Sequence, residues 1–155
     1  MAAGTILSGV EAVARHPVLG GNAREVDLAS KGRGYRTHDI EGFEVLVGKG
    51  DAENDALTFE VADPHDFWLH VAGPSGSHVV VRNPDRLAEL PRAVLEAAAS
   101  LAAWHSKARG SRGKVLVHAC RVSDVSKPRG FAPGEVQLRR WSAVKVYARD
   151  AGGPS

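Results

Sequence analysis

The stretch HVAGPSGSHVVVR, residues 70–82, gathers side chains that can do chemistry within one short segment. His70 and His78 bracket a turn of glycine, proline and serine, and a β-branched run ends at Arg82. Histidines change charge near neutral pH and serve as acids, bases and metal ligands. The pattern predicts either a plain β-hairpin or the working edge of a site.

A hairpin symmetric about Pro74 sorts these side chains by face. Its strands would be DFWLHV (66–71) and SHVVVR (77–82), in which alternate residues share a face. One face then carries the polar groups, as the pairs His70–His78 and Asp66–Arg82 with Trp68–Val80 between them. The other face carries the apolar pairs Leu69–Val79 and Phe67–Val81. Because a one-residue slip would mix the two sets, the pattern favours this register.

The polar face lacks a complete metal or catalytic motif. A zinc site needs three or four ligands, and no CxxC or HxxE spacing supplies them, although His65, His105 or His118 could approach in space. Ser77 is not surrounded by a nucleophile elbow. We therefore expect no metal, no cofactor and no catalytic residue. The turn GPSGS is not a Walker loop, and it is either a phosphate contact or a plain hairpin turn.

Positive charge is concentrated in the last third of the chain. Residues 1–104 carry 9 Lys/Arg against 15 Asp/Glu, a balance of −6, and residues 105–155 carry 11 against 3, a balance of +8. Most of these cations fall in two segments, WHSKARGSRGK (Lys107, Arg109, Arg112, Lys114) and KPRGFAPGEVQLRRW (Lys127, Arg129, Arg139, Arg140). Such clusters neutralise phosphates, and an exposed Trp141 would stack on a base. The alternative is a solvated basic surface with Trp141 packed in the core or at its rim.

The elements around these groups predict an α+β fold with a largely antiparallel sheet. The clearest helix spans about 91–109, with an apolar face and Gly110 as its stop. A short helix near 53–61, capped by Asn54, competes with a strand over LTFEV. Strands are expected at 43–47, 66–71, 77–82, 114–122, 134–139 and 143–148.

The chain of 155 residues fits one domain. We expect a flexible or weakly helical N-terminal tail over 1–33, a domain over 34–150 and a disordered C-terminus over 151–155. No run approaches the roughly 18 apolar residues of a membrane helix, and no signal peptide is evident. The single cysteine, Cys120, cannot form an internal disulfide and is expected half-buried in a strand. These features predict a cytoplasmic protein without a membrane partner.

Four segments taken in order resemble the RNA-binding domain of the NFACT family, NFACT-R. They are GFEVLVGKGDAENDALTF, DFWLHVAGPSGSHVVVR, AASLAAWHSKARG and SKPRGFAPGEVQL, and the resemblance spans about residues 34–148. In that family the domain is a C-terminal part of ribosome quality-control factors that work on stalled large subunits. The chain is too short for the other parts of those factors and looks like a stand-alone form. We therefore do not expect it to recruit tRNA or to extend nascent chains.

The family pattern falls on residues of all four segments. It covers Gly48, Asn54, Asp66, Trp68, His70, Gly76, Ser77, His78, Ser106, Lys107, Arg109, Lys127, Pro128, Gly130, Pro133 and Gly134. The family usually reads Pro-Gly-Ser-His at the turn, whereas here Ser75 precedes Gly76 and the proline stands at Pro74. The spacing of the two histidines is unchanged.

The resemblance implies a non-enzymatic protein that binds structured RNA, either ribosomal RNA or tRNA. The large ribosomal subunit is a further expected partner, and DNA is not expected. The residues expected to bind RNA are Asp66, Trp68, His70, Ser77, His78, Arg82, Lys107, Arg109, Lys127, Arg129, Arg139 and Arg140. Two alternatives stay open: an enzyme that modifies or hydrolyses RNA with His70 and His78, and a module that binds proteins on the ribosome.

Overall fold

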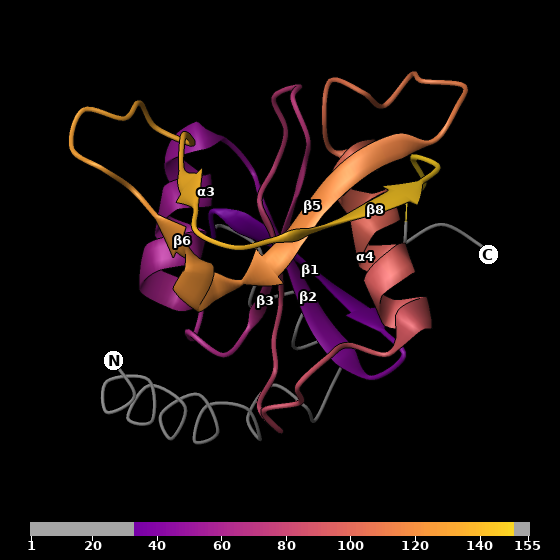
Figure 1. Ribbon diagram of the computed structural model, residues 1–155, viewed down its shortest axis with the longest axis horizontal. Coiled ribbons are helices and arrows are strands. Elements are labelled where there is room, and N and C mark those ends of the chain that lie inside the picture. The colour runs from indigo at the N-terminus through magenta and orange to yellow at the C-terminus, as the bar shows by residue number, and fades with distance from the viewer. Residues whose placement is uncertain (1–32, 151–155) are drawn as a thin grey trace.

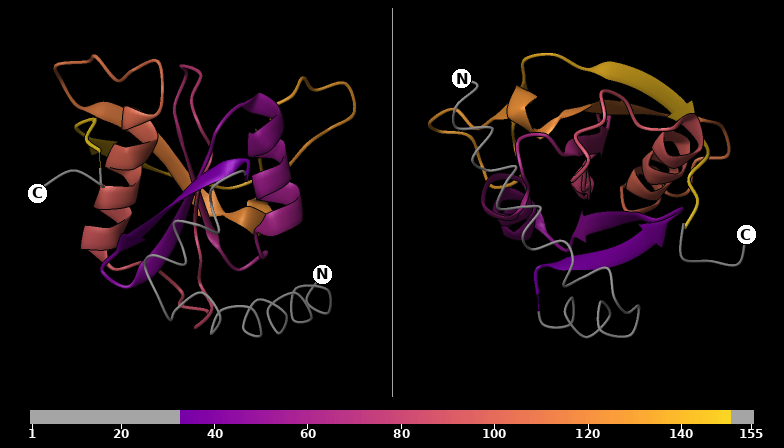
Figure 2. Two further views of the ribbon diagram at one scale, coloured as in Figure 1. Left: turned by 180° about the vertical axis from the view of Figure 1, so that it is seen from behind. Right: turned by 90° about the horizontal axis from the view of Figure 1, so that it is seen from below.

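The computed structural model describes residues 33–150, in which a six-stranded sheet carries helices on both faces (Figures 1 and 2). Its strands lie in the order β1-β2-β4-β3-β5-β8, and every neighbouring pair is antiparallel. Their bounds are β1 Tyr35–Ile40, β2 Phe43–Gly48, β3 Phe67–Val71, β4 Val79–Val81, β5 Val115–Arg121 and β8 Ser142–Val146. The α+β class is confirmed. The expectations for residues 1–32 and 151–155 lie outside the described residues.

Most expected strands are confirmed with shifted ends. The strand expected over 134–139 is wrong except at β7 (Gln137–Leu138), which pairs with β6 (Val125–Ser126) in a separate small sheet. Strand β1 is not predicted by the sequence pattern, because YRTHDI places few apolar residues in alternation. Strand β4 begins at Val79 rather than at 77, because the backbone N–H groups of Ser77 and His78 donate elsewhere, to His105 and Asn54.

The predicted hairpin register is confirmed. Residues Phe67, Trp68 and Leu69 pair with Val81, Val80 and Val79 in turn. Just beyond the ladder, the Arg82 Nε lies 2.9 Å from an Asp66 carboxylate oxygen. Alternation along each strand favours this outcome, because a one-residue slip would take Val79 and Val81 off the face that carries Leu69.

Helix α4 (Arg92–Trp104) packs against the sheet, which curls around it so that β1 and β2 lie on one side and β5 and β8 on the other (Figure 2). Its buried face includes Val94, Ala98, Leu101 and Ala102. The expected end at residue 109 is wrong. Beyond Trp104 the chain leaves the helix because its backbone bonds to the loop after β3: Ser77 N–H donates to the His105 carbonyl, and Lys107 N–H donates to the Ser75 carbonyl, each at 2.9 Å.

A second helical segment covers the opposite face of the sheet. It consists of α3 (Asp51–Ala56) continued by a π-helical turn, η1 (Leu57–Val61), so the expected helix near 53–61 is confirmed and the competing strand is excluded. Gly50 occupies the N-cap position, and the expected cap at Asn54 is wrong. Asn54 instead lies in the interior of α3. Its side chain is buried and accepts a hydrogen bond from the His78 N–H at 3.0 Å.

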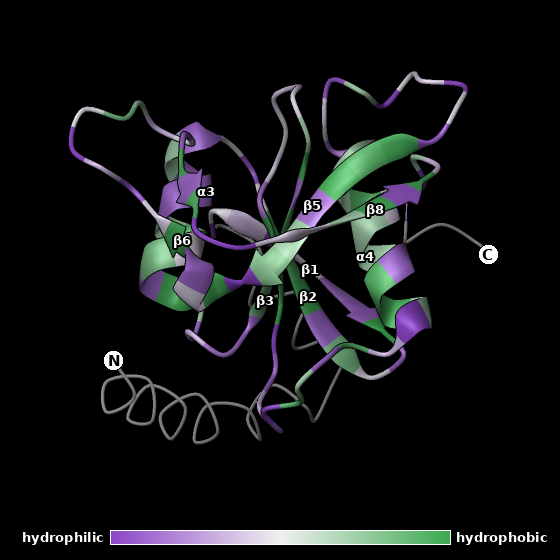
Figure 3. Ribbon diagram, in the orientation of Figure 1, coloured by the Kyte–Doolittle hydropathy of each residue, from purple (hydrophilic) through white to green (hydrophobic). Residues whose placement is uncertain are grey.

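Both faces of the central strands are therefore buried. One core lies under α4 and includes Leu69, Val71 and Val117. The other includes Leu46, Leu57, Trp68 and Val80, and it is closed by the 3-10 turn η2 (Val122–Asp124) and the β6–β7 pair. Figure 3 shows apolar residues gathered on α4 and the central strands, with hydrophilic residues prominent in the long loops. Within residues 33–150, no helix is long and apolar enough to cross a membrane.

Candidate functional site

The expected polar face of the hairpin is an internal network rather than a surface. Asp66, Trp68 and His78 are at most 1% exposed, and Arg82 is 8% exposed. The Asp66 carboxylate accepts hydrogen bonds from the backbone N–H groups of Asp63 and Asn83 in addition to its contact with Arg82. Burial raises the pKa of Asp66, and Arg82 and these N–H groups offset part of that rise. Asp66 and Arg82 thus hold the ends of the hairpin together inside the fold.

His78 has both ring nitrogens engaged. Its Nε2 lies 3.1 Å from the Gly134 carbonyl, which can only accept, so Nε2 carries the proton. The Thr58 hydroxyl, 2.8 Å away, then donates to Nδ1, and Thr58 accepts in turn from the Trp68 indole N–H at 3.2 Å. Burial, together with the neighbouring His70 imidazole, lowers the pKa of His78 to about 4. The ring is neutral at physiological pH and ties the hairpin to η1 and to the segment before β7.

The loop between β3 and β4 is fixed to the end of α4. Gly76 forms a β-bridge with Ser106, and a Cβ added at Gly76 would lie 2.5 Å from the Ser106 Cβ, so only glycine permits this approach. The Ser77 hydroxyl donates to the Gly48 carbonyl at 2.7 Å. The GPSGS segment is therefore not a tight hairpin turn. The N–H groups of Ser77 and His78, which a phosphate would need, donate within the protein.

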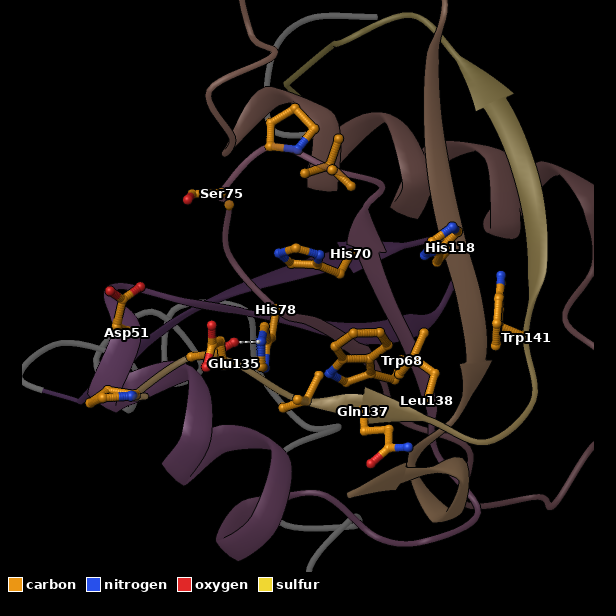
Figure 4. A pocket seen from close by; sticks show the side chains of 17 residues that line it. Asp51, Trp68, His70, Ser75, His78, His118, Glu135, Gln137, Leu138 and Trp141 are labelled. Atoms are coloured by element: carbon orange, nitrogen blue, oxygen red, sulfur yellow. Dashed lines mark hydrogen bonds between the residues drawn. The ribbon is translucent and has the colours of Figure 1, made fainter. Parts of the chain in front are cut away.

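A pocket of about 610 Å³ opens beside this loop. Figure 4 shows His118 and Trp141 at one end, Asp51 and Glu135 toward the other, and Trp68 and His70 between them. Trp141 is 51% exposed, and its ring centre lies 5.5 Å from that of His118. His70 pairs with His118 across β3 and β5, and its ring lies edge-on to that of His78 at 5.5 Å. Burial lowers the pKa of His70 as well.

The outer face of β5 and β8 is open to solvent. Val115, Val117, Val144 and Val146 turn inward against α4, so the alternating residues turn outward. We call the outward set the β5–β8 face; it consists of Lys114, Leu116, Lys145 and Tyr147. All four are exposed, Leu116 at 39% and Tyr147 at 49%, and the Lys114 ammonium lies 5.6 Å from the centre of the Tyr147 ring. Cations and an aromatic side chain thus share one solvent-facing sheet surface.

The expected basic residues divide into exposed and engaged groups. Lys107, Arg109, Arg129 and Arg140 are exposed on the loops at 105–114, 127–136 and 139–141. The first two of these loops extend to the same side of the molecule as the loop at 72–78 (Figure 1). Arg109 stacks over Trp104, with its guanidinium carbon 3.9 Å from the ring centre.

Two of the expected cations are partly committed to the fold. The Lys127 ammonium donates to the carbonyls of Ala132 and Glu135 and forms an ion pair with Asp55 at 3.2 Å. Arg139 pairs with Asp124 at 3.0 Å but keeps a largely exposed side chain. Lys127 therefore fixes its own loop above α3, whereas Arg139 remains reachable from solvent.

The structure thus separates the twelve expected residues into layers. Asp66, Trp68, His78 and Arg82 are buried, and His70, Ser77 and Lys127 are half-buried. The five exposed residues are Lys107, Arg109, Arg129, Arg139 and Arg140. The twelve do not include Lys145, Tyr147 or His118, nor Trp141, although an exposed Trp141 is expected to stack on a base. Alternation in KVLVHACRV and AVKVYA is the signal that could have found the first three, because they alternate with the apolar residues Val117, Ala119, Val144 and Val146. Within residues 33–150, no group of three His, Cys, Asp or Glu side chains could hold a metal ion.

These features define a class: an α+β domain with a basic, aromatic-bearing sheet face beside an aromatic pocket. The family model described as NFACT protein RNA binding domain matches residues 34–140, and the chain belongs to this family. Similar proteins include the Rqc2 homolog RqcH of Bacillus subtilis (strain 168), 41% identical over 97 residues, which are 61% of this chain and 16% of that protein. The Rqc2 homolog RqcH of Streptococcus suis (strain 05ZYH33) is 40% identical over 103 residues, 66% of this chain and 18% of that protein.

A solved structure has a similar fold. The C-terminal part of the fibronectin/fibrinogen-binding protein from Streptococcus suis (FBPS) superposes with a TM-score of 0.67 at 34% identity, over 74% of this chain and 45% of that one. The curated relatives are much longer proteins, and the chain spans less than a fifth of their length.

Proposed function

We propose that this chain binds structured RNA, ribosomal RNA or tRNA, in ribosome quality control in the cytoplasm, without catalysing a reaction. The observation that carries the proposal is the β5–β8 face, where Lys114 and Lys145 are exposed beside Tyr147. Membership in a family of RNA-binding domains and similarity to Rqc2 homologs support the nature of the ligand and its context. The large ribosomal subunit is the assembly in which such an RNA would be met.

The distribution of charge favours phosphate contacts. Residues 105–155 carry a balance of +8, and most of the exposed cations among them lie on the β5–β8 face and on the loops at 105–114, 127–136 and 139–141. Phosphates supply most of the affinity in such complexes, and each neutralised phosphate steepens the dependence of affinity on salt. Tyr147 adds a ring on which an exposed base can stack.

The geometry of His78 argues against an enzyme that uses His70 and His78 as its acid and base. A general base must come within hydrogen-bonding distance of its substrate, directly or through one water. His78 is 0% exposed, and both of its nitrogens already have partners in Thr58 and Gly134. His78 therefore supports a structural role, and His70 alone does not make the pair.

The test is fluorescence anisotropy of a labelled tRNA and of a ribosomal RNA hairpin at several salt concentrations. We expect log affinity to fall linearly with log salt for the wild-type chain. The Lys114→Gln/Lys145→Gln variant should weaken binding and reduce the slope by about 2, roughly one per lost phosphate contact. The control is Arg92→Gln, which removes one exposed cation at the start of α4, away from the face, and should leave the slope unchanged.

Two results would overturn the proposal. One is the absence of RNA binding at low salt. The other is association with ribosomes that persists at high salt and is lost in a Leu116→Ser variant, because an apolar protein contact is not weakened by counterion competition. Leu116 is 39% exposed at the centre of the face, so this variant directly tests docking to a ribosomal protein.

A further inference from the structure

We propose that the pocket beside the β5–β8 face receives one unstacked nucleobase of the bound RNA. The inference rests on the proposed function and specifies which part of an RNA the site recognises. Flat aromatic walls, a size suited to a small organic group and the absence of basic lining residues all point to a base rather than to a phosphate.

The walls of the pocket are rings. Trp141 and His118 form the accessible end, with ring centres 5.5 Å apart and planes inclined by 47°. Trp68 is 1% exposed and stacks with His70 at 5.8 Å, so these two rings form the floor rather than a rim. Unstacked bases bind proteins by stacking on such side chains. The exposed Trp141 is the ring that an incoming base meets first.

The charge of the lining excludes a phosphate. None of its 17 residues is Lys or Arg, whereas the carboxylates of Asp51 and Glu135 face the space (Figure 4). Carboxylate oxygens accept hydrogen bonds from the exocyclic amino groups of adenine, guanine and cytosine. The His70 ring lines the same space and is itself hydrogen-bonded to the backbone at Gly76 and Val71, so it contributes a fixed ring rather than a polar edge. A base with an exocyclic amine therefore fits this lining better than uracil.

The surroundings keep the sugar–phosphate backbone outside. Arg140 is exposed and precedes Trp141 directly, and the backbone of Lys107 is hydrogen-bonded to Ser75 at the lip of the pocket. Two exposed cationic residues, Lys107 and Arg140, are thus neighbours in the chain or by backbone contact of residues that line an acidic and aromatic interior. The volume of about 610 Å³ falls within the roughly 300–1,000 Å³ of small-ligand pockets and far exceeds the space that a single ammonium group fills.

The experiment compares two RNA hairpins that carry 2-aminopurine, a fluorescent base with an exocyclic amine, and contain the same number of phosphates. In one hairpin 2-aminopurine is bulged, and in the other it is paired. We expect the wild-type chain to bind the bulged hairpin about tenfold more tightly, since stacking of one base is commonly worth a factor of this order. Binding should also quench the fluorescence of the bulged 2-aminopurine, because the base leaves water and stacks.

Three variants isolate the pocket. Trp141→Ala should bind the two hairpins with equal affinity and abolish the quenching, whereas Trp141→Phe should keep part of the preference because a ring remains. The control is Phe59→Ala, which removes an aromatic side chain that is 41% exposed on η1 and does not line the pocket. This control should retain the full preference for the bulged hairpin.

The outcomes separate this inference from the proposed function. Equal, salt-dependent binding of both hairpins by the wild-type chain overturns the pocket and leaves RNA binding standing. A bulge preference that survives in Trp141→Ala overturns it too. If neither hairpin binds, the proposed function fails and the inference fails with it.

Discussion

Acidification should destabilise the fold through His78. The buried, doubly hydrogen-bonded ring has a pKa of about 4, whereas the same side chain in the unfolded chain has the ordinary value of 6.5. Between these two pH values the unfolded chain binds a proton that the folded chain does not. The free energy of unfolding is therefore highest above pH 6.5 and falls as the pH approaches 4.

The size of the effect follows from the shift. At about 1.4 kcal/mol for each unit of pKa, lowering the pH from 7.5 to 4.5 should reduce the free energy of unfolding by roughly 2 to 3 kcal/mol through His78 alone. Burial lowers the pKa values of His70 and His105 as well, so their contributions have the same sign. The raised pKa of Asp66 acts in the opposite direction at the acid end of the range.

The assay is urea unfolding at pH 7.5 and 4.5 of the wild-type chain and of His78→Gln. The variant loses stability at both values, but its loss between them should be smaller than that of the wild-type chain by those 2 to 3 kcal/mol. A second measurement follows the His78 ring by NMR, where the midpoint of titration should lie near 4. Equal pH dependence in the two proteins would refute the reasoning, as would a midpoint close to 6.5.

Three further perturbations test the interior. Arg82→Ala leaves the Asp66 carboxylate buried without its cation, which should cost about 3 to 5 kcal/mol in urea unfolding; a loss below about 1 kcal/mol would show that the pair is dispensable. Gly48→Ala drives a methyl group into a buried amide and should cost about 1 to 3 kcal/mol or more, whereas Gly110→Ala, with nothing within 4 Å, should change stability little. Burial raises the pKa of the Cys120 thiol to about 12, so a thiol reagent at pH 8 should label the folded protein slowly and the urea-unfolded protein quickly; rapid labelling of the folded form would contradict this.

Local patterns predicted the hairpin well. Alternation over 66–71 and 77–82, with a hairpin symmetric about Pro74, predicted the pairing of Trp68 with Val80, because a one-residue slip would mix polar and apolar groups. The Asp66–Arg82 contact followed from the same register. The end of α4 did not follow from local pattern, since its last residue is set by hydrogen bonds to a loop some 30 positions earlier.

The spacing of residues in the sequence did not predict that the polar side chains of the hairpin are buried. A strand face that carries Asp66 and His78 is expected to face solvent, because such side chains are seldom buried without partners. Here the His78 imidazole is bonded by Thr58 of η1 and by Gly134. The Asp66 carboxylate is bonded by Arg82 and by the backbone N–H groups of Asp63 and Asn83. Conversely, Lys145 and Tyr147 stand among valines in a short strand, and their exposure depends on β8 lying at the edge of the sheet.

The contacts of Gly134 show that the pocket is assembled from segments synthesised at different times. Gly134 is hydrogen-bonded to His78 and Asp55, which lie 56 and 79 positions earlier in the chain. A ribosome that has synthesised the hairpin and α4 has not yet delivered the residues that close the pocket, Pro133 to Leu138 and Trp141. A nascent chain interrupted before this point also lacks Val144 and Val146, which belong to the core under α4, and Val136 and Leu138, which pack against the second core. The pocket therefore forms only after residues 133–141 have been made, because they complete a wall whose other residues lie earlier in the chain, between Asp51 and His118.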